Sequence, residues 1–186
     1  MGFYSRRQLG KLGLAAVGHD VAISDRCSLY GAGSISVGDH VRIDDFSIVT
    51  ARQPVVIGCY VHVSAYAFLS GSFGITVGDF SNVGIRATVL SNSDDFGGDW
   101  LAGPMAPAEL RGASCAPVEL GPHTVLGTGT VVLPGVRLGA GVAVGALSLV
   151  KESLPDWGVY AGIPARWLRP RQRRVEELAR QLPLRS

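Results

Sequence analysis

The chain has 186 residues and a formal net charge of +2, with 47% hydrophobic residues, 17% charged residues and 25 glycines. This composition is typical of a folded globular protein with a sizeable core, so it argues against disorder and against membrane insertion. We predict one domain over residues 1–186. The three cysteines have no disulfide-framework or metal-ligand spacing, which favours a reducing, cytoplasmic location and predicts no metal site.

Residues 1–16 are predicted to form a helical segment at one end of the domain. Arg6, Arg7 and Lys11 make this segment basic. The uncharged run that follows is too short and too rich in glycine for a signal peptide. We therefore expect the segment to be part of the fold.

A repeat begins at Val17, where aliphatic residues recur in steps of six, six and eight. The members are Val17, Ile23 and Leu29, then Val37, Ile43 and Val49, then Ile57, Val63 and Leu69, then Val77, Val83 and Val89. The six-residue step resumes after an interruption, at Leu120, Leu126, Val132, Leu138, Val144 and Val150. Neither a helical period nor simple alternation fits this pattern. It predicts a chain that coils into stacked short strands with a turn every six residues.

The pattern [LIV]-G-x-x-[STAV]-x and the closing segment VYAGIPARWL resemble the hexapeptide-repeat acyltransferases. The resemblance covers residues 17–168. It implies an all-β fold, a left-handed parallel β-helix that forms homotrimers and transfers acyl groups from coenzyme A. The left hand rests on the resemblance alone, because parallel crossovers are in general right-handed. The pieces FYSRRQLGKLG, VRIDDFSIV, VHVSAY and SDDFGG look most like bacterial enzymes that acetylate nucleotide-linked amino sugars.

The 20-residue period places Arg42, His62 and Asn82 above one another on an outward polar ladder, where Arg42 and Asn82, together with Asp44 and Asp45, are predicted to bind substrate. The VHV around His62 resembles a stretch of the amino-sugar N-acetyltransferases whose histidine lies near the acetyl group. A further catalytic histidine of those enzymes, nine residues earlier, is glutamine here. His62 is therefore a general base, a thioester contact or an interface residue. Asp44 and Asp45 either orient these groups or cap a corner of the coil.

A long loop, predicted over about residues 93–117, interrupts the repeat. In the related O-acetyltransferases, a histidine near the start of such a loop deprotonates a hydroxyl; Ser93, Asp94 and Asp95 stand there in this chain. A hydroxyl needs strong base assistance, whereas about a tenth of an amine with a pKa near 8 is neutral at pH 7. We therefore predict that Asp94, with Asp95 beside it, binds an acceptor amine. The alternative is a pair of aspartates that caps the loop.

The late coils and the basic C-terminus are predicted to bind coenzyme A. Gly127, Gly145 and Ala146 are small enough for the pantetheine arm, although tight turns explain most glycines. The resemblance places Lys151 and Arg166 near the 3′-phosphate, to which arginine is well suited.

A basic helix is predicted over residues 169–186. Seven arginines against two glutamates in residues 166–186 favour a phosphorylated ligand there, and the lack of interleaved aromatic residues argues against nucleic acid. The four histidines are expected to occupy different repeat positions, which argues against a zinc site between subunits.

Our hypothesis is a cytoplasmic homotrimer that transfers an acetyl group from acetyl-CoA, its co-substrate, to the amine of a nucleotide-linked deoxyamino sugar. It would hold no permanently bound cofactor. The alternative is an O-acetyltransferase for a sugar, glycan or antibiotic hydroxyl, with His62 as the base.

Overall fold

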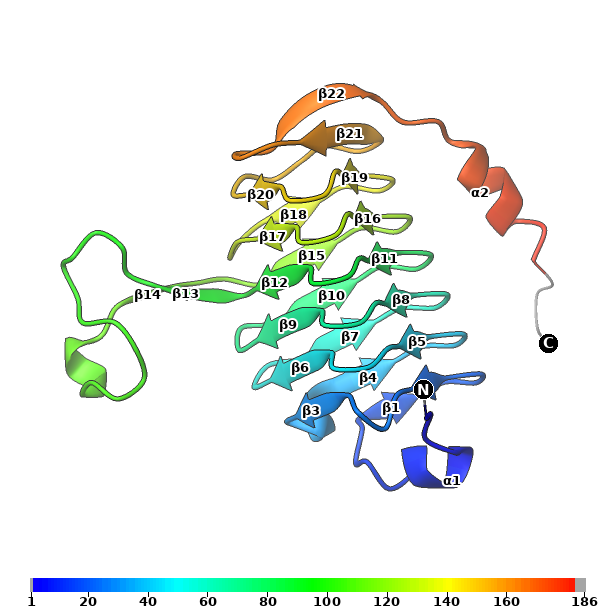
Figure 1. Ribbon diagram of the computed structural model, residues 1–186, viewed down its shortest axis with the longest axis horizontal. Helices are drawn as coiled ribbons and strands as arrows, with labels where there is room; N and C mark the ends of the chain where they lie inside the picture. Colours follow the sequence, from blue (N-terminus) through cyan, green and yellow to red (C-terminus); the bar gives the residue numbers. More distant parts are fainter. Residues whose placement is uncertain (1, 183–186) are drawn as a thin grey trace.

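The computed structural model describes residues 2–182, which wind into a β-solenoid with three sheets, parallel except for the last strand pair of the second sheet (Figure 1). The first sheet contains β1 (Ala16–Val17), β4 (Ile35–Val37), β7 (Val55–Ile57), β10 (Ile75–Val77), β15 (Val118–Leu120) and β18 (Arg137–Leu138). The second contains β2 (Ala22–Ile23), β5 (Arg42–Ile43), β8 (His62–Val63), β11 (Asn82–Val83), β16 (Val125–Leu126), β19 (Ala143–Val144), β21 (Gly158–Ala161) and β22 (Arg166–Pro170). The third contains β3 (Ser28–Tyr30), β6 (Ile48–Ala51), β9 (Phe68–Gly71), β12 (Thr88–Leu90), β17 (Val131–Val132) and β20 (Leu149–Val150).

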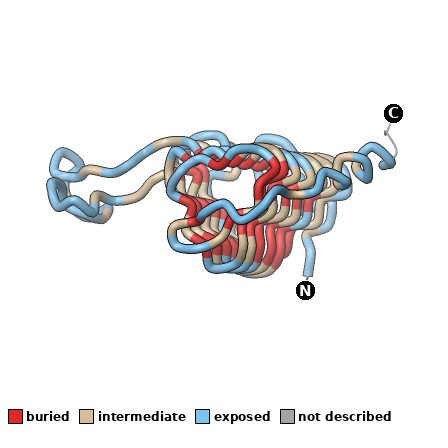
Figure 2. The backbone as a smooth tube through the Cα atoms, turned by 90° about the horizontal axis from the view of Figure 1, so that it is seen from above, coloured by how far each residue is buried: buried red, intermediate tan, exposed pale blue. Residues whose placement is uncertain are grey.

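The aliphatic residues of the repeat form the core of the solenoid. In the second sheet, Val63, Val83 and Leu126 stack in register and are at most 1% exposed. Viewed from above, the buried positions are gathered in the stacked walls of the coil (Figure 2). Hydroxyl groups at the small inward positions bond to backbone carbonyls, as when Thr124 Oγ1 donates to Gly121 O at 2.6 Å. The predicted fold class, stacked coils of hexapeptide repeats, is therefore confirmed, while its left hand stays a prediction.

A stack of rings follows one corner of the coils. Its members are His40, Tyr60, Phe80, His123 and Trp157. The first four have ring centroids 4.4–5.0 Å apart, a spacing typical of favourable aromatic contacts. His40 and His123 thus hold the same repeat position, and the prediction that the histidines differ in position is wrong for this pair. Gly141 leaves room for Trp157, because a Cβ at Gly141 would lie 2.3 Å from the Trp157 ring.

The two ends of the solenoid carry short helices. At the N-terminus, α1 covers only Arg6–Leu9, with a capping box between Ser5 and Gln8. At the other end, the predicted helix over 169–186 is reduced to α2 (Arg174–Ala179). Residues 169 and 170 belong instead to β22, which pairs antiparallel with β21 and so covers an otherwise unpaired edge. Residues 183–186 of that prediction lie outside the described part.

The interruption of the repeat projects from the solenoid as an arm, residues 92–115 (Figure 1). Its base is an antiparallel pair, β13 (Asn92–Asp94) and β14 (Ala113–Cys115), and it includes the short 3-10 helix η2 (Ala108–Leu110). A second such helix, η1 (Ala32–Ser34), precedes β4. Large apolar side chains are exposed on the arm, namely Phe96, Trp100, Leu101, Met105 and Leu110. Among residues 2–182, no helix is long and apolar enough to cross a membrane.

Candidate active site

The predicted polar ladder is present on the second sheet. Arg42 pairs in register with His62, and His62 with Asn82. The parallel strands β5, β8 and β11 hold these residues on successive coils, as the 20-residue period predicts. Asn82 therefore neighbours His62, and its role in binding substrate stays a prediction.

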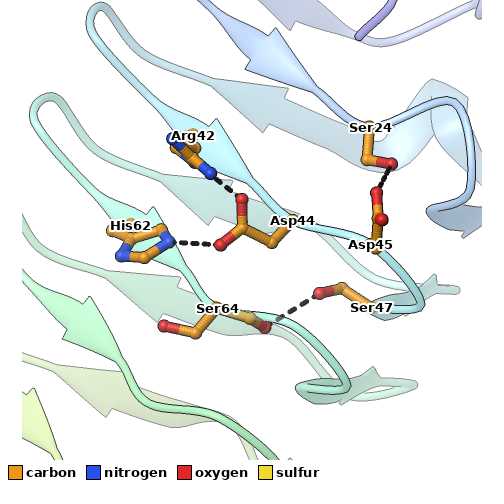
Figure 3. Close-up of polar contacts among 7 residues, drawn as sticks. All are labelled: Ser24, Arg42, Asp44, Asp45, Ser47, His62 and Ser64. Atoms are coloured by element: carbon orange, nitrogen blue, oxygen red, sulfur yellow. Dashed lines mark hydrogen bonds and ion pairs between the residues drawn. The ribbon is translucent and has the colours of Figure 1, made fainter. Parts of the chain in front are cut away.

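Asp44 joins Arg42 and His62, two members of the ladder (Figure 3). Its Oδ1 accepts from Arg42 Nε at 2.6 Å, and its Oδ2 lies 2.7 Å from His62 Nε2. Burial of the carboxyl raises the pKa of Asp44, but the hydrogen bonds and charges of His62 and Arg42 outweigh this effect, so the pKa lies below its ordinary value. Asp44 is thus an ionised carboxylate that orients both neighbours, which supports the orienting role predicted as one of two alternatives.

The contact with Asp44 determines which nitrogen of His62 is available to a substrate. An ionised carboxylate only accepts hydrogen bonds, so Nε2 carries the hydrogen and donates it. In the neutral ring, Nδ1 is then the free base. The His62 side chain is 42% exposed, so a ligand can reach it. This arrangement permits His62 to take up or return a proton.

Asp45 points away from the ladder. Its Oδ1 accepts from the buried Ser24 hydroxyl (Figure 3). Its Oδ2 lies 3.8 Å from Arg26 Nη1. These contacts fix the corner between the first coils. The structure therefore supports the capping alternative for Asp45.

Asp95 has a comparable role in the arm. Its carboxylate accepts from the backbone N–H groups of Gly97, Gly98, Asp99 and Trp100, at 2.9–3.1 Å. These bonds, that from Gly97 foremost, hold the pKa of Asp95 below its ordinary value. Because both oxygens are engaged by the arm itself, the structure favours the loop-capping alternative for Asp95 over binding of an amine.

Asp94 differs from Asp95 because it lines a cavity of about 510 Å³ at the base of the arm. Arg52 and Arg111 line the same cavity, together with Asn92 and Cys115. Neither arginine was predicted from the sequence as a site residue. The only signal was that Arg52 adjoins the glutamine that replaces a family histidine, and no repeat position marks Arg111.

His62 and Asp94 do not meet within one chain. His62 lies on the second sheet, whereas Asp94 follows β12 of the third sheet and lies beyond it. A four-residue strand such as β9 spans roughly 13 Å. Figure 1 shows the arm and strand β8 on opposite sides of the solenoid. A site that uses both residues requires more than one chain.

The residues predicted for coenzyme A fall into two groups. Lys151 and Arg166 line one cavity of about 150 Å³ near the end of the solenoid, so the fold brings these two cations together. Gly127 and Gly145 lie in the stacked coils, where a Cβ on Gly127 would be 2.5 Å from the backbone nitrogen of Ala146. Coil stacking therefore requires the glycine at 127 whether or not a ligand binds.

Replacing Arg166 by alanine is expected to raise the Kd for coenzyme A by about 10- to 100-fold, the value of a charge-assisted hydrogen bond. The loss of affinity should come from the lost contact between Arg166 and the 3′-phosphate. Isothermal titration with coenzyme A and with 3′-dephospho-coenzyme A measures it. Wild type should prefer coenzyme A, whereas the variant should bind both alike. Arg180→Ala, at the end of α2, is the control, and an unchanged preference in Arg166→Ala would contradict the assignment.

Replacing Asp44 by asparagine is expected to lower the free energy of unfolding at pH 7 by about 1.5–3 kcal/mol, because two charge-assisted hydrogen bonds are weakened. The folded-state pKa of Asp44 is lowered, so its contribution is present above the unfolded pKa, about 3.9, and is lost as the pH falls through the folded value. Urea titrations at pH 7 and pH 3 should show the difference from wild type shrinking at pH 3. The exposed Glu109→Gln should show no such difference, and a constant difference for Asp44→Asn would refute the linkage.

The structure is a β-solenoid that holds a carboxylate in a ligand-sized cavity, an aspartate–histidine pair, and Lys151 and Arg166 in one end cavity. This arrangement fits the class of β-solenoid group-transfer enzymes, and the comparisons with known proteins agree. No protein-family model matches the chain. It is 36% identical to dTDP-4-amino-4,6-dideoxy-D-glucose acyltransferase of Escherichia coli over 179 residues, which cover 96% of this chain and 93% of that protein.

Solved structures agree with this likeness. AntD, an N-acyltransferase from Bacillus cereus in complex with dTDP and 3-hydroxybutyryl-CoA, has 42% identity and a TM-score of 0.93, covering 96% of this chain and 95% of AntD. An AntD variant in complex with dTDP-4-amino-4,6-dideoxyglucose and coenzyme A gives the same values. The chain belongs to the hexapeptide-repeat β-helix acyltransferases and is an acyl-CoA-dependent enzyme. The predicted family and co-substrate class are thereby confirmed.

Proposed function

We propose that this chain transfers an acyl group from acyl-CoA to the amine of dTDP-4-amino-4,6-dideoxyglucose. The observation that carries the proposal is the likeness to AntD over 96% of the chain at 42% identity. The position of Asp94 supports it, because an exposed carboxylate in a ligand-sized cavity suits an ammonium group. The acetyl group remains our prediction for the transferred acyl group.

The reaction needs little base strength. Asp94 attracts and orients the ammonium form and can receive its proton, leaving the neutral amine to attack the thioester carbonyl. The attack forms a tetrahedral oxyanion, which backbone N–H groups would stabilise. Its collapse expels the coenzyme A thiolate, and the extra proton on the attacking nitrogen passes to this thiolate, directly or through His62, to give the amide and the free thiol.

We further propose that the enzyme is a cytoplasmic homotrimer in which the arm of one subunit reaches the ladder of the next. Exposed apolar side chains on the arm, including Phe96 and Met105 at 94% exposure, support burial against another copy. The separation of His62 from Asp94 within one chain supports a shared site. Three free cysteines, among them the exposed Cys115, support a reducing compartment. Sedimentation equilibrium tests the trimer.

The function is tested by thiol release from acetyl-CoA and 3-hydroxybutyryl-CoA in the presence of dTDP-4-amino-4,6-dideoxyglucose. The matched control is the same sugar nucleotide with a hydroxyl at position 4. We expect release with the amine only, and mass spectrometry should show the amide. Absence of release with the amine and either acyl donor would reject the proposal.

A second candidate is O-acylation of a hydroxyl, which the 2.7 Å contact between His62 and Asp44 favours, because a paired histidine can act as a general base. The hydroxyl control distinguishes the two candidates. Release with the hydroxyl compound would make His62 the first residue to replace.

A further inference from the structure

The cavity at the base of the arm holds two arginines to which the reaction above gives no role. Arg52 directly follows β6, and its backbone nitrogen lies 3.3 Å from Gly71 O. Arg111 precedes β14, and its backbone nitrogen lies 3.4 Å from Ala108 O. Both arginines line the same cavity as Asp94. The fold therefore anchors two cations and one carboxylate around one space.

These charged groups are not neutralised by one another or by their surroundings. Within residues 2–182, none of Arg52, Asp94 and Arg111 belongs to an ion pair. Among the described residues that line the cavity, which include Cys115, only these three carry ionised side chains. Two positive charges and one negative charge give the cavity a net charge of +1. A complementary ligand carries at least two negative charges and one positive charge.

A nucleoside diphosphate linked to an amino sugar has this distribution of charge. Its diphosphate carries two negative charges, and its protonated amine carries one positive charge. One guanidinium group can donate two parallel hydrogen bonds to two phosphate oxygens, with well-defined geometry. The volume of about 510 Å³ also lies within the usual range for small-molecule sites, about 300–1,000 Å³.

We propose that Arg52 and Arg111 together bind the diphosphate of the acceptor nucleotide and thereby place its amine at Asp94. This inference rests on the proposed function and assigns two positioning residues to it. Coenzyme A also carries phosphates, but the two cations predicted for its 3′-phosphate, Lys151 and Arg166, lie in a separate cavity near the end of the solenoid.

Binding can be measured without turnover, because Cys115 lines the cavity and is exposed. Iodoacetamide should alkylate Cys115, whereas burial raises the pKa of Cys27 to about 12 and keeps that thiol unreactive. Mass spectrometry of the labelled peptide reports on Cys115 alone. We expect dTDP to slow labelling in wild type, and thymidine at the same concentration not to do so, since thymidine lacks the diphosphate.

The variants are Arg52→Ala, Arg111→Ala and their combination, with Arg7→Ala on α1 as the control. Each single change should raise the Kd for dTDP at least about tenfold. The double variant should lose protection of Cys115 by dTDP, yet retain the thermal midpoint and the Kd for coenzyme A. Its KM for the amino sugar should rise while kcat at saturation changes little. Arg52→Lys should recover part of the affinity.

The outcomes separate this inference from the proposed function. If wild type acylates the amino sugar but the double variant binds dTDP as tightly as wild type, the arginine assignment is wrong and the function stands. If wild type neither binds dTDP nor acylates the amino sugar, both are wrong. A loss of coenzyme A affinity in the double variant would also overturn the assignment, because it would place the donor in this cavity.

Discussion

Asp94→Asn is expected to lower kcat/KM for the amino sugar by about 100-fold, through both a higher KM and a lower kcat. The change removes the negative charge that attracts the ammonium group and the acceptor of its proton. General acid–base assistance typically raises the reaction rate about 10²–10⁴-fold. We expect the lower end of this range, because an amine that is partly neutral at pH 7 depends less on a base. Steady-state kinetics with varied dTDP-amino sugar at saturating acyl-CoA measure both constants.

Asp99→Asn is the matched control for this prediction. Asp99 lies in the same arm, and its backbone N–H rather than its side chain bonds to Asp95. Its kinetics should resemble those of wild type. If Asp94→Asn also behaved as wild type, the assignment of the acceptor site to the base of the arm would be wrong.

Leu126→Ala is expected to lower the free energy of unfolding by about 2–5 kcal/mol, the usual cost of removing a buried leucine side chain. Leu126 is 1% exposed and lies in β16, in register with Val83 of one neighbouring coil and Val144 of the other. The cavity left by the truncation cannot close easily, because backbone hydrogen bonds on both sides hold the coil spacing. Urea denaturation followed by circular dichroism measures the loss.

Leu147→Ala provides the comparison for a leucine outside the core. Leu147 is 70% exposed on a corner of the same late coils, so its truncation should change the free energy of unfolding by less than about 0.5 kcal/mol. Equal losses for the two leucines would contradict the inward and outward assignment of the repeat.

The ladder could be predicted from the sequence, whereas the C-terminal helix was predicted too long, and both outcomes have one physical origin. A coil of fixed length repeats its own geometry, so a 20-residue spacing is enough to place Arg42 beside His62 and His62 beside Asn82. The C-terminus lies outside the repeat. There, the same residues can form either a helix or a strand that pairs with an exposed sheet edge. The chain forms the strand β22 up to Pro170, because β21 has an unpaired edge.

The candidate site was predictable only in its separate parts. Asp94 and Asp95 are adjacent and chemically identical in the sequence. Only the folded arm shows that the Asp95 carboxylate accepts hydrogen bonds from four backbone N–H groups, whereas Asp94 lines a cavity. Arg111 escaped notice because irregular backbone has no period from which its position could be inferred.

The coil, its inward residues, the place of the interruption and the family can all be read from the order of the amino acids, because each follows from a local repeat of side-chain size and polarity. Which polar groups meet depends on the folded chain. The fold placed Asp44 between Arg42 and His62, gathered Arg52 and Arg111 around Asp94, and brought Lys151 and Arg166 to one cavity. Apart from the bond between Arg42 and Asp44, which lie two residues apart, these contacts join residues from different coils, or from the irregular arm and the coil below it. Such contacts depend on where the backbone turns in space.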